Sequence, residues 1–399
     1  MIPSLSSHDQ QQAISREPGA SRVRSLGTSV FTEISTLARE HNAINLGQGF
    51  PDFDGPEEMM RAFQEALAAG HNQYAISNGE PVLREAIASH TARFYGMTVD
   101  PLREVTVTSG ATEALWCSAF AFIEPGDEVV VFEPCYDSYV PAIRMAGGIP
   151  VPVTLHAPSF RFDPDELRAA FTPRTRAIYI NTPHNPSGTV FSREELEVIA
   201  GLCREYDALA ITDEVYEHIL YPDVVHCRLA SLPGMWERTL TISSGGKSFS
   251  FTGWKVGWAI GPEPLQTALR RVHQFTVFAS TTPAQHAIAV GLALPDTYFA
   301  GLADDYLRRR DYLMGALRGA GLTPTAPEGS YFILAGIEGF PQENGLEFSR
   351  HLIREVGVAS IPLDSFYLRP EHGRGYVRFC FCKQWETLHE AARRLALLR

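Results

Sequence analysis

The stretch VTVTSGATEALWCSAFAFIEPGDEVVVF, residues 105–132, contains the pattern that decides the fold. Val105–Thr108 is a short β-branched run typical of a strand, and Thr112–Ile123 has a helical pattern. Glu128–Phe132 is again typical of a strand. Strand, helix and strand in this order predict parallel strands, with the helix packed on one face of their sheet.

The same alternation continues towards the C-terminus. Further runs typical of strands are Ile149–Val153, Ala177–Ile180, Ala208–Thr212 and Thr239–Ser243. Ser192–Tyr206 predicts a helix, because Ser192 with Glu195 three residues later forms a capping-box pattern. We therefore predict an α/β protein with a large, mostly parallel sheet that is covered on both faces.

The pattern changes near Leu294–Thr297 to a mixture typical of a smaller α+β domain. Its predicted elements are the helices Ala300–Gly319, Gly345–Glu355 and Thr387–Leu398 and the strands Tyr331–Ala335, Val358–Ile361 and Tyr376–Phe381. We expect a large domain over residues 51–295 and a small domain made of residues 21–50 and 296–399. Residues 1–20 are polar without an apolar period and predict a flexible tail.

Charge and composition exclude several classes of protein. Among 399 residues, 34 basic and 46 acidic side chains leave a formal net charge of −12. This excludes a general nucleic-acid binder, which presents a basic face. Apolar runs such as Val129–Phe132 are far shorter than the roughly 20 residues that span a bilayer. Six irregularly spaced cysteines are typical of free thiols, and residues 1–20 show no targeting pattern, so we expect a cytoplasmic protein without membrane partners.

Polar residues gather where the predicted strands end, which is the edge of a parallel sheet where ligands bind. Lys247 follows one strand in a Ser/Gly turn, Asp213 follows another, and Asn185 lies in a loop rich in proline after a third. At Gly110 a strand passes directly into a helix, whose first N–H groups can bind a phosphate. These strand ends offer a lysine, an acid, an amide and an anion site.

Three familiar sites are excluded by spacing. A P-loop needs glycine five residues before Gly246, where Thr241 stands, and a dinucleotide fingerprint at Gly47-Gln-Gly49 fails because Asp52 takes the third glycine position. The pair Cys380-x-Cys382 lacks the second pair of ligands that a zinc site requires. Since the 13 histidines form no metal motif either, we expect no metal.

The ordered set of motifs resembles the class I aminotransferases, which are fold-type I enzymes that depend on pyridoxal 5′-phosphate (PLP). The similarity is to the methionine, glutamine and kynurenine aminotransferases, and it extends from about Arg22 to the C-terminus. The motifs are Asn45–Phe53, Gln73–Ala75, Thr108–Glu113, Asn181–Gly188, Thr212–Tyr216, Ser244–Lys247, Thr252–Trp258 and Arg378–Lys383.

The resemblance implies catalytic roles for three residues. Lys247 would form the Schiff base with PLP and then move a proton between the substrate Cα and the cofactor. Asp213 would keep the pyridine nitrogen protonated, so that the ring accepts electrons. Tyr216, together with Asn185, would donate hydrogen bonds to the phenolic oxygen of the ring.

The resemblance also implies how the rest of the cofactor is held. Tyr136 would stack on the ring, and Tyr74 would reach the phosphate of the neighbouring subunit in a homodimer. The other phosphate-binding residues would be Gly110, Ala111, Thr112, Ser244 and Lys255.

For the substrate, the family pattern implies that Arg378 binds the carboxylate through its guanidinium fork, with Asn185 and Gly49 beside it. Phe31 would line the pocket, and Phe278 would be contributed by the other subunit of the dimer. Such aromatic walls favour a bulky neutral amino donor, namely methionine, glutamine or an aromatic or kynurenine-type amino acid, with a 2-oxo acid as acceptor.

Two residues refine this specificity. Ala279 follows Phe278 where the kynurenine enzymes carry a histidine, which disfavours kynurenine and favours methionine. Arg24 is a cation that could alter the pocket. The alternative functions are a PLP-dependent β-lyase that cleaves cysteine S-conjugates with the same residues, and a non-catalytic regulator with this fold.

Overall fold

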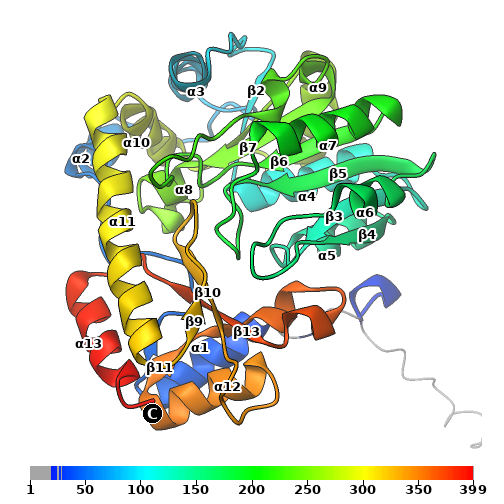
Figure 1. Ribbon diagram of the computed structural model, residues 1–399. Coiled ribbons are helices and arrows are strands. Elements are labelled where there is room, and N and C mark those ends of the chain that lie inside the picture. Colours follow the sequence, from blue (N-terminus) through cyan, green and yellow to red (C-terminus); the bar gives the residue numbers. More distant parts are fainter. Residues whose placement is uncertain (1–18, 25–26, 28, 399) are drawn as a thin grey trace, which may run out of the picture.

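The computed structural model describes residues 19–24, 27 and 29–398 (Figure 1). The predicted tail over residues 1–20 therefore lies almost entirely outside the described residues. Among the described residues, no helix is long and apolar enough to cross a membrane.

A seven-stranded sheet forms the larger part of the molecule, with the strand order β2-β8-β7-β6-β5-β3-β4 (Figure 1). Its strands are β2 (Val105–Thr108), β3 (Glu128–Glu133), β4 (Ile149–Thr154), β5 (Thr175–Asn181), β6 (Leu209–Asp213), β7 (Thr239–Ser244) and β8 (Gly257–Ile260). β8 is antiparallel to both neighbours, and the other pairings are parallel. The prediction of a mostly parallel sheet is confirmed.

Helices cover both faces of this sheet. They are α2 (Glu57–Ala68), α3 (Pro81–Tyr95), α4 (Ala111–Phe122), α5 (Tyr139–Met145), α6 (Pro164–Ala169), α7 (Arg193–Glu205), α8 (Gly245–Ser248), α9 (Glu263–Thr276) and α10 (Thr282–Leu292). The alternation of side chains along β3 explains why both faces are apolar: Val129 and Val131 pack with α4, α5 and α9, whereas Val130 and Phe132 pack with α7.

The predicted capping box fixes the start of α7. The Ser192 hydroxyl accepts a hydrogen bond from the backbone N–H of Glu195, whose carboxylate accepts one from the Ser192 N–H. The predicted helix Ser192–Tyr206 is confirmed, because these two residues are the caps of α7.

A second, four-stranded antiparallel sheet has the order β12-β13-β10-β9. Its strands are β9 (Thr323–Pro324), β10 (Phe332–Gly336), β12 (Ile361–Pro362) and β13 (Tyr376–Cys380), and the associated helices are α1 (Val30–Glu40), α11 (Asp296–Gly319), α12 (Gly345–His351) and α13 (Trp385–Leu395). In Figure 1 the helices α1, α12 and α13 and the strands β9, β10 and β13 gather below the large sheet, and α11 runs upward from them along one side. Together they form the smaller α+β part that the sequence predicted.

Two predicted elements are wrong in detail. The predicted strand Val358–Ile361 is split: β11 (Val358–Ala359) pairs with β1 (Ile44–Asn45), and β12 joins the four-stranded sheet. The chain changes sheets at Ser360, which a local apolar pattern does not reveal. The predicted helix Gly345–Glu355 leaves α-geometry after His351 and continues as a π-helical turn, Leu352–Val356.

Short 3₁₀ turns connect several elements. They are Ser21–Val23, Leu229–Ser231, Trp236–Arg238, Thr252–Trp254, Leu363–Phe366 and Pro370–Gly373. α11 begins at Asp296, four residues before its predicted start, because Pro295 lies at its N-cap.

We predict that Gly257→Ala destabilises the protein. Gly257 opens β8, and a Cβ there would lie 2.5 Å from the backbone N of Ala111 and 2.5 Å from the carbonyl carbon of Gly110. The turn between β2 and α4 would have to move, at a cost of about 1–3 kcal/mol. The midpoint of thermal unfolding should fall, whereas Gly253→Ala, whose Cβ meets nothing within 4 Å, should leave it unchanged. Equal midpoints for the two variants would contradict this account.

Candidate active site

A cavity of about 500 Å³ opens where β5, β6 and β7 end, between the large sheet and β13. Thirteen of the residues predicted for the site line it: Phe31, Gly49, Gly110, Ala111, Thr112, Tyr136, Asn185, Asp213, Tyr216, Ser244, Lys247, Lys255 and Arg378. Tyr74 and Phe278 do not line this cavity. They lie elsewhere on the same chain, with ring centroids 5.6 Å apart.

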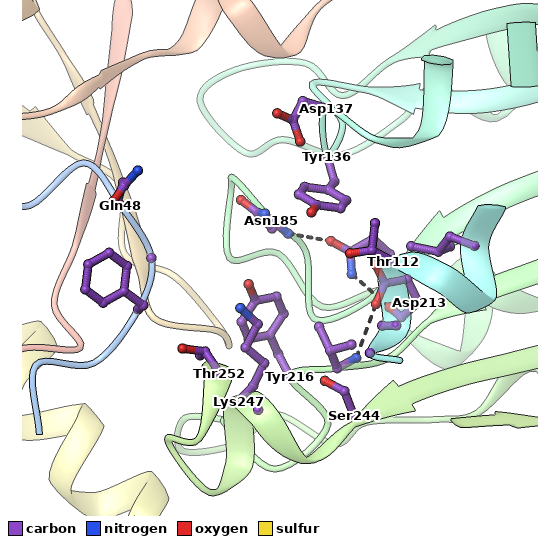
Figure 2. A pocket seen from close by; sticks show the side chains of 18 of the residues that line it. Gln48, Thr112, Tyr136, Asp137, Asn185, Asp213, Tyr216, Ser244, Lys247 and Thr252 are labelled. Carbon is purple, nitrogen blue, oxygen red and sulfur yellow. Dashed lines mark hydrogen bonds between the residues drawn. The ribbon is translucent and has the colours of Figure 1, made fainter. Parts of the chain in front are cut away.

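Lys247 projects into the cavity from α8, directly after β7 (Figure 2). Burial lowers the pKa of its amine, Cys382 and Asp213 oppose that change, and Lys255 and Arg378 reinforce it. The Nζ atom is 5.7 Å from the ring centroid of Tyr216. A larger share of uncharged amine follows, which is the form that acts as a nucleophile or a base.

Asp213 is the buried acid at the end of β6. Its Oδ2 accepts a 2.7 Å hydrogen bond from the Tyr139 hydroxyl. Burial raises the pKa of Asp213 to about 6, although the hydrogen bond from Tyr139 and the charge of Lys247 both act to lower it. Sequence reasoning missed Tyr139. The feature of the sequence that could have identified it is its position three residues after Tyr136, where α5 begins.

A chain of hydrogen bonds joins the walls of the cavity (Figure 2). The Asn181 amide donates to the carbonyl of Asp213 at 2.8 Å, and its Oδ1 accepts from the backbone N–H of Asn185 at 2.6 Å. The Asn185 Oδ1 in turn accepts from Arg378 Nη1 at 2.7 Å. Asn181 is therefore a second site residue that sequence reasoning missed.

Arg378 is buried and held in one orientation. Its Nη2 donates to the carbonyl of Gly47 at 2.7 Å, and the ring of Phe332 lies 4.1 Å from its guanidinium carbon. Its Nε has no hydrogen-bond partner among the described residues. The Arg378 side chain lines the cavity, and the planar fork of a guanidinium suits a carboxylate ligand.

The turn from β2 into α4 forms an anion site. Gly110 has φ +79°, and a Cβ on it would lie 3.0 Å from Lys255 Nζ, so glycine allows the lysine to approach the start of the helix. The first N–H groups of α4, at Ala111 and Thr112, have no partner within the helix. With Ser244 they line the same end of the cavity. These donors fit the phosphate of PLP. The amine of Lys247 fits its carbonyl carbon, and the carboxyl group of Asp213 fits its ring nitrogen.

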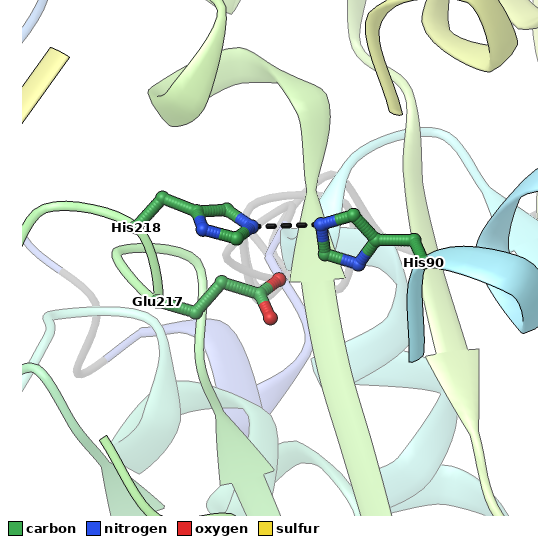
Figure 3. A group of neighbouring side chains, drawn as sticks. All are labelled: His90, Glu217 and His218. Atoms are coloured by element: carbon green, nitrogen blue, oxygen red, sulfur yellow. Dashed lines mark hydrogen bonds between the residues drawn. The ribbon is translucent and has the colours of Figure 1, made fainter. Parts of the chain in front are cut away.

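Behind the cavity, His90, Glu217 and His218 form a buried cluster (Figure 3). Their potential metal-ligand atoms lie within 4.8 Å of one another, and the two histidine Nε2 atoms are 2.7 Å apart. Burial lowers the pKa of His90 to about 3 and that of His218 to about 4, so both rings are neutral. Sequence spacing gave no sign of this cluster, because residues 90 and 218 are far apart along the chain.

Hydrogen bonds already occupy the Glu217 carboxylate. It accepts from the Tyr95 hydroxyl at 2.5 Å, from Ser243 at 2.6 Å and from Arg228 Nη2 at 2.6 Å. Burial is the largest influence on the pKa of Glu217 and would raise it, but the charge of Arg228, the neighbouring His218 and His90 and the hydrogen bond from Ser243 together outweigh burial and lower the pKa. We interpret the cluster as a hydrogen-bonded network, and the absence of a bound metal stays a prediction.

Comparisons with known proteins relate the chain to the aminotransferases. A model of the class I and II aminotransferases matches residues 41–395. The chain is 42% identical over 378 residues to methionine aminotransferase from Escherichia coli K12, covering 95% of this chain and 98% of that protein. It is 40% identical over 415 residues to mouse kynurenine–oxoglutarate transaminase 1, covering 96% of this chain and 98% of that protein.

Solved structures give the same result. N-succinyldiaminopimelate aminotransferase from Mycobacterium tuberculosis superposes with a TM-score of 0.92 at 44% identity, covering 96% of this chain and 100% of that chain. The Escherichia coli methionine aminotransferase superposes with a TM-score of 0.92 at 42% identity, covering 95% and 99% of the two chains.

We predict that Glu217→Gln destabilises the protein by about 3–5 kcal/mol, because it leaves the buried Arg228 without its full counter-charge. Chemical unfolding measures this loss. Glu205→Gln is the matched control, since it breaks an exposed ion pair with Arg168 and should cost at most about 1 kcal/mol. Similar losses of stability in both variants would contradict the network interpretation. So would one bound metal ion per wild-type chain that is absent from the Glu217→Gln variant.

Proposed function

Because the chain belongs to the class I and II aminotransferases, we propose that it transfers the amino group of a bulky neutral amino acid to a 2-oxo acid in two half-reactions. One observation carries this proposal: the side chains of Lys247 and Arg378 line the same cavity. The amine suits proton transfer at a substrate Cα, and the guanidinium suits the adjacent carboxylate.

The cofactor site follows from the same residues. When bound, PLP supplies a carbonyl carbon that takes the amino group and a ring that withdraws electrons from the substrate Cα. Lys255 and Ser244, which line the cavity, would bind its phosphate together with the N-terminus of α4. Asp213 would hold the ring nitrogen, and Tyr136 would stack on the ring.

Lys247 would hold the cofactor covalently and would then act as the base that moves the Cα proton. Its lowered pKa increases the fraction of free amine that can accept this proton. Arg378 would bind the substrate carboxylate and thereby orient the Cα–H bond towards Lys247. Tyr216 and Asn185 would donate hydrogen bonds to the phenolic oxygen of the ring.

Specificity for a neutral side chain follows from the lining. Phe31, Tyr136 and Phe332 supply aromatic surface. In the described part of the chain, the cations that line the cavity are Lys247, Lys255 and Arg378, all of which have roles already. Arg24 is exposed, donates to the carbonyl of Gly19 and does not line the cavity.

The names of the relatives cover methionine, kynurenine and N-succinyldiaminopimelate, so similarity alone does not choose the donor. Ala279, in place of the histidine of kynurenine enzymes, disfavours kynurenine. We propose methionine, glutamine or an aromatic amino acid as the donor.

We also propose a homodimer. Tyr74 is 87% exposed and Phe275 is 89% exposed, and Ile76, Val277 and Phe278 are further exposed apolar side chains of the same two segments. An exposed apolar patch of this kind is typical of an interface. A second copy would cover it and bring Tyr74 and Phe278 to the neighbouring cavity.

We propose the same division into domains as the sequence predicted. The large domain comprises residues 51–295, and the small domain comprises residues 21–50 and 296–399. We also propose a cytoplasmic location, which the six unpaired cysteines support.

We predict that borohydride reduction of the PLP-loaded enzyme labels Lys247, since it holds the cofactor covalently. The sequence contains three lysines, so peptide mass spectrometry distinguishes Lys247 from Lys255 and Lys383. Lys247→Ala should abolish labelling and slow the half-reaction with methionine or glutamine at least about a hundredfold, as followed by cofactor absorbance.

Label on another lysine would contradict the assignment. Pyruvate and ammonia released from a cysteine S-conjugate without an acceptor would instead identify the β-lyase.

We predict that Phe275→Glu shifts the protein from dimer to monomer in analytical ultracentrifugation, because it places a charge in the apolar patch. Val225→Glu is the control, since Val225 is 81% exposed and lies outside the patch. A monomeric wild-type protein, or a Phe275→Glu variant that dimerises as tightly as the wild type, would contradict the homodimer.

A further inference from the structure

Asp137 is an acid in the cavity with no role so far. It directly follows Tyr136, lines the same wall and is labelled beside it in Figure 2. Asp213, the other aspartate of the lining, is hydrogen-bonded by Tyr139. Among the described residues, by contrast, no side chain donates a hydrogen bond to the Asp137 carboxylate.

Asp137 and Arg378, the residue proposed to bind the substrate carboxylate, line the same cavity. Burial raises the pKa of Asp137, and the guanidinium of Arg378 acts to lower it. Arg378 already donates to Asn185 and to the carbonyl of Gly47. A substrate held by Arg378 would therefore have its remaining atoms in a cavity lined by aromatic rings and by the exposed carboxylate of Asp137.

We propose that Asp137 is a specificity-determining residue that rejects amino acids and oxo acids with a second carboxylate. This inference rests on the proposed aminotransferase function and narrows its substrate class. A second carboxylate would enter the cavity that Asp137 lines and would be repelled by its like charge, and the cations of the described lining already serve the cofactor and the first carboxylate. A neutral side chain avoids this repulsion, and the amide of glutamine can donate a hydrogen bond to Asp137.

The test compares glutamine with glutamate, which have nearly the same shape and differ in charge. Single-turnover half-reactions of the PLP-loaded enzyme at pH 8 give kcat/KM for each. Asp137→Asn should raise kcat/KM for glutamate about tenfold or more and change that for glutamine less than about threefold. Asp137→Glu is the matched control, because it keeps the charge and should keep the discrimination.

A binding measurement gives a second readout that needs no turnover. Succinate and its monoamide, succinamate, are non-reacting probes that differ in one charged group, and calorimetry on the loaded enzyme gives their dissociation constants. Asp137→Asn should tighten succinate binding about tenfold and leave succinamate binding nearly unchanged.

An equal change in kcat/KM for glutamine and glutamate in Asp137→Asn, with an equal change in the dissociation constants of succinate and succinamate, would overturn the proposal. Asp137 would then act on the carboxylate that both members of each pair share, or on folding. Unchanged discrimination in Asp137→Asn would also overturn it. Wild-type turnover of methionine or glutamine tests the proposed function separately, because the succinate and succinamate comparison tests Asp137 even without turnover.

Discussion

The hydrogen bond from Arg378 to Asn185 is the interaction on which the site depends, because it joins the two sheets across the cavity. Arg378 belongs to β13 of the small sheet, and Asn185 follows β5 of the large one. A guanidinium in a cavity loses hydration, and two oxygen acceptors and an aromatic face offset that loss here. The backbone of Asn185 is fixed in turn by Asn181, which also bonds to Asp213.

Burial also sets the protonation of the two central residues. It lowers the pKa of Lys247 and raises that of Asp213, because low solvation disfavours the charged form of each. The cavity therefore holds an amine and an acid that are both moved towards neutrality. A phosphate at the start of α4 and a protonated ring nitrogen beside Asp213 would each meet a complementary group already in position.

The sequence predicted the parts of the structure that local patterns determine. β2 has the predicted bounds, Ser192 caps α7, and thirteen predicted residues line the cavity because the ends of parallel strands meet at one edge. Contacts between distant segments escaped it. Tyr139 reaches Asp213 across 74 residues, and His90 meets His218 across 128. The sequence also did not predict that Val358–Ile361 is divided between two sheets, because an apolar run does not show with which strand it pairs.

The turn after β6 connects the cavity with the buried network behind it. Asp213 and Tyr216 line the cavity, whereas Glu214 and Glu217 of the same turn contact Arg228. Ser243, which donates to Glu217, precedes the cavity residue Ser244 in β7. Removing one partner of a buried ion pair is strongly destabilising, because it leaves an uncompensated buried charge. Since Glu217 directly follows Tyr216 in the chain, loss of Glu217 should affect the cavity although Glu217 does not line it.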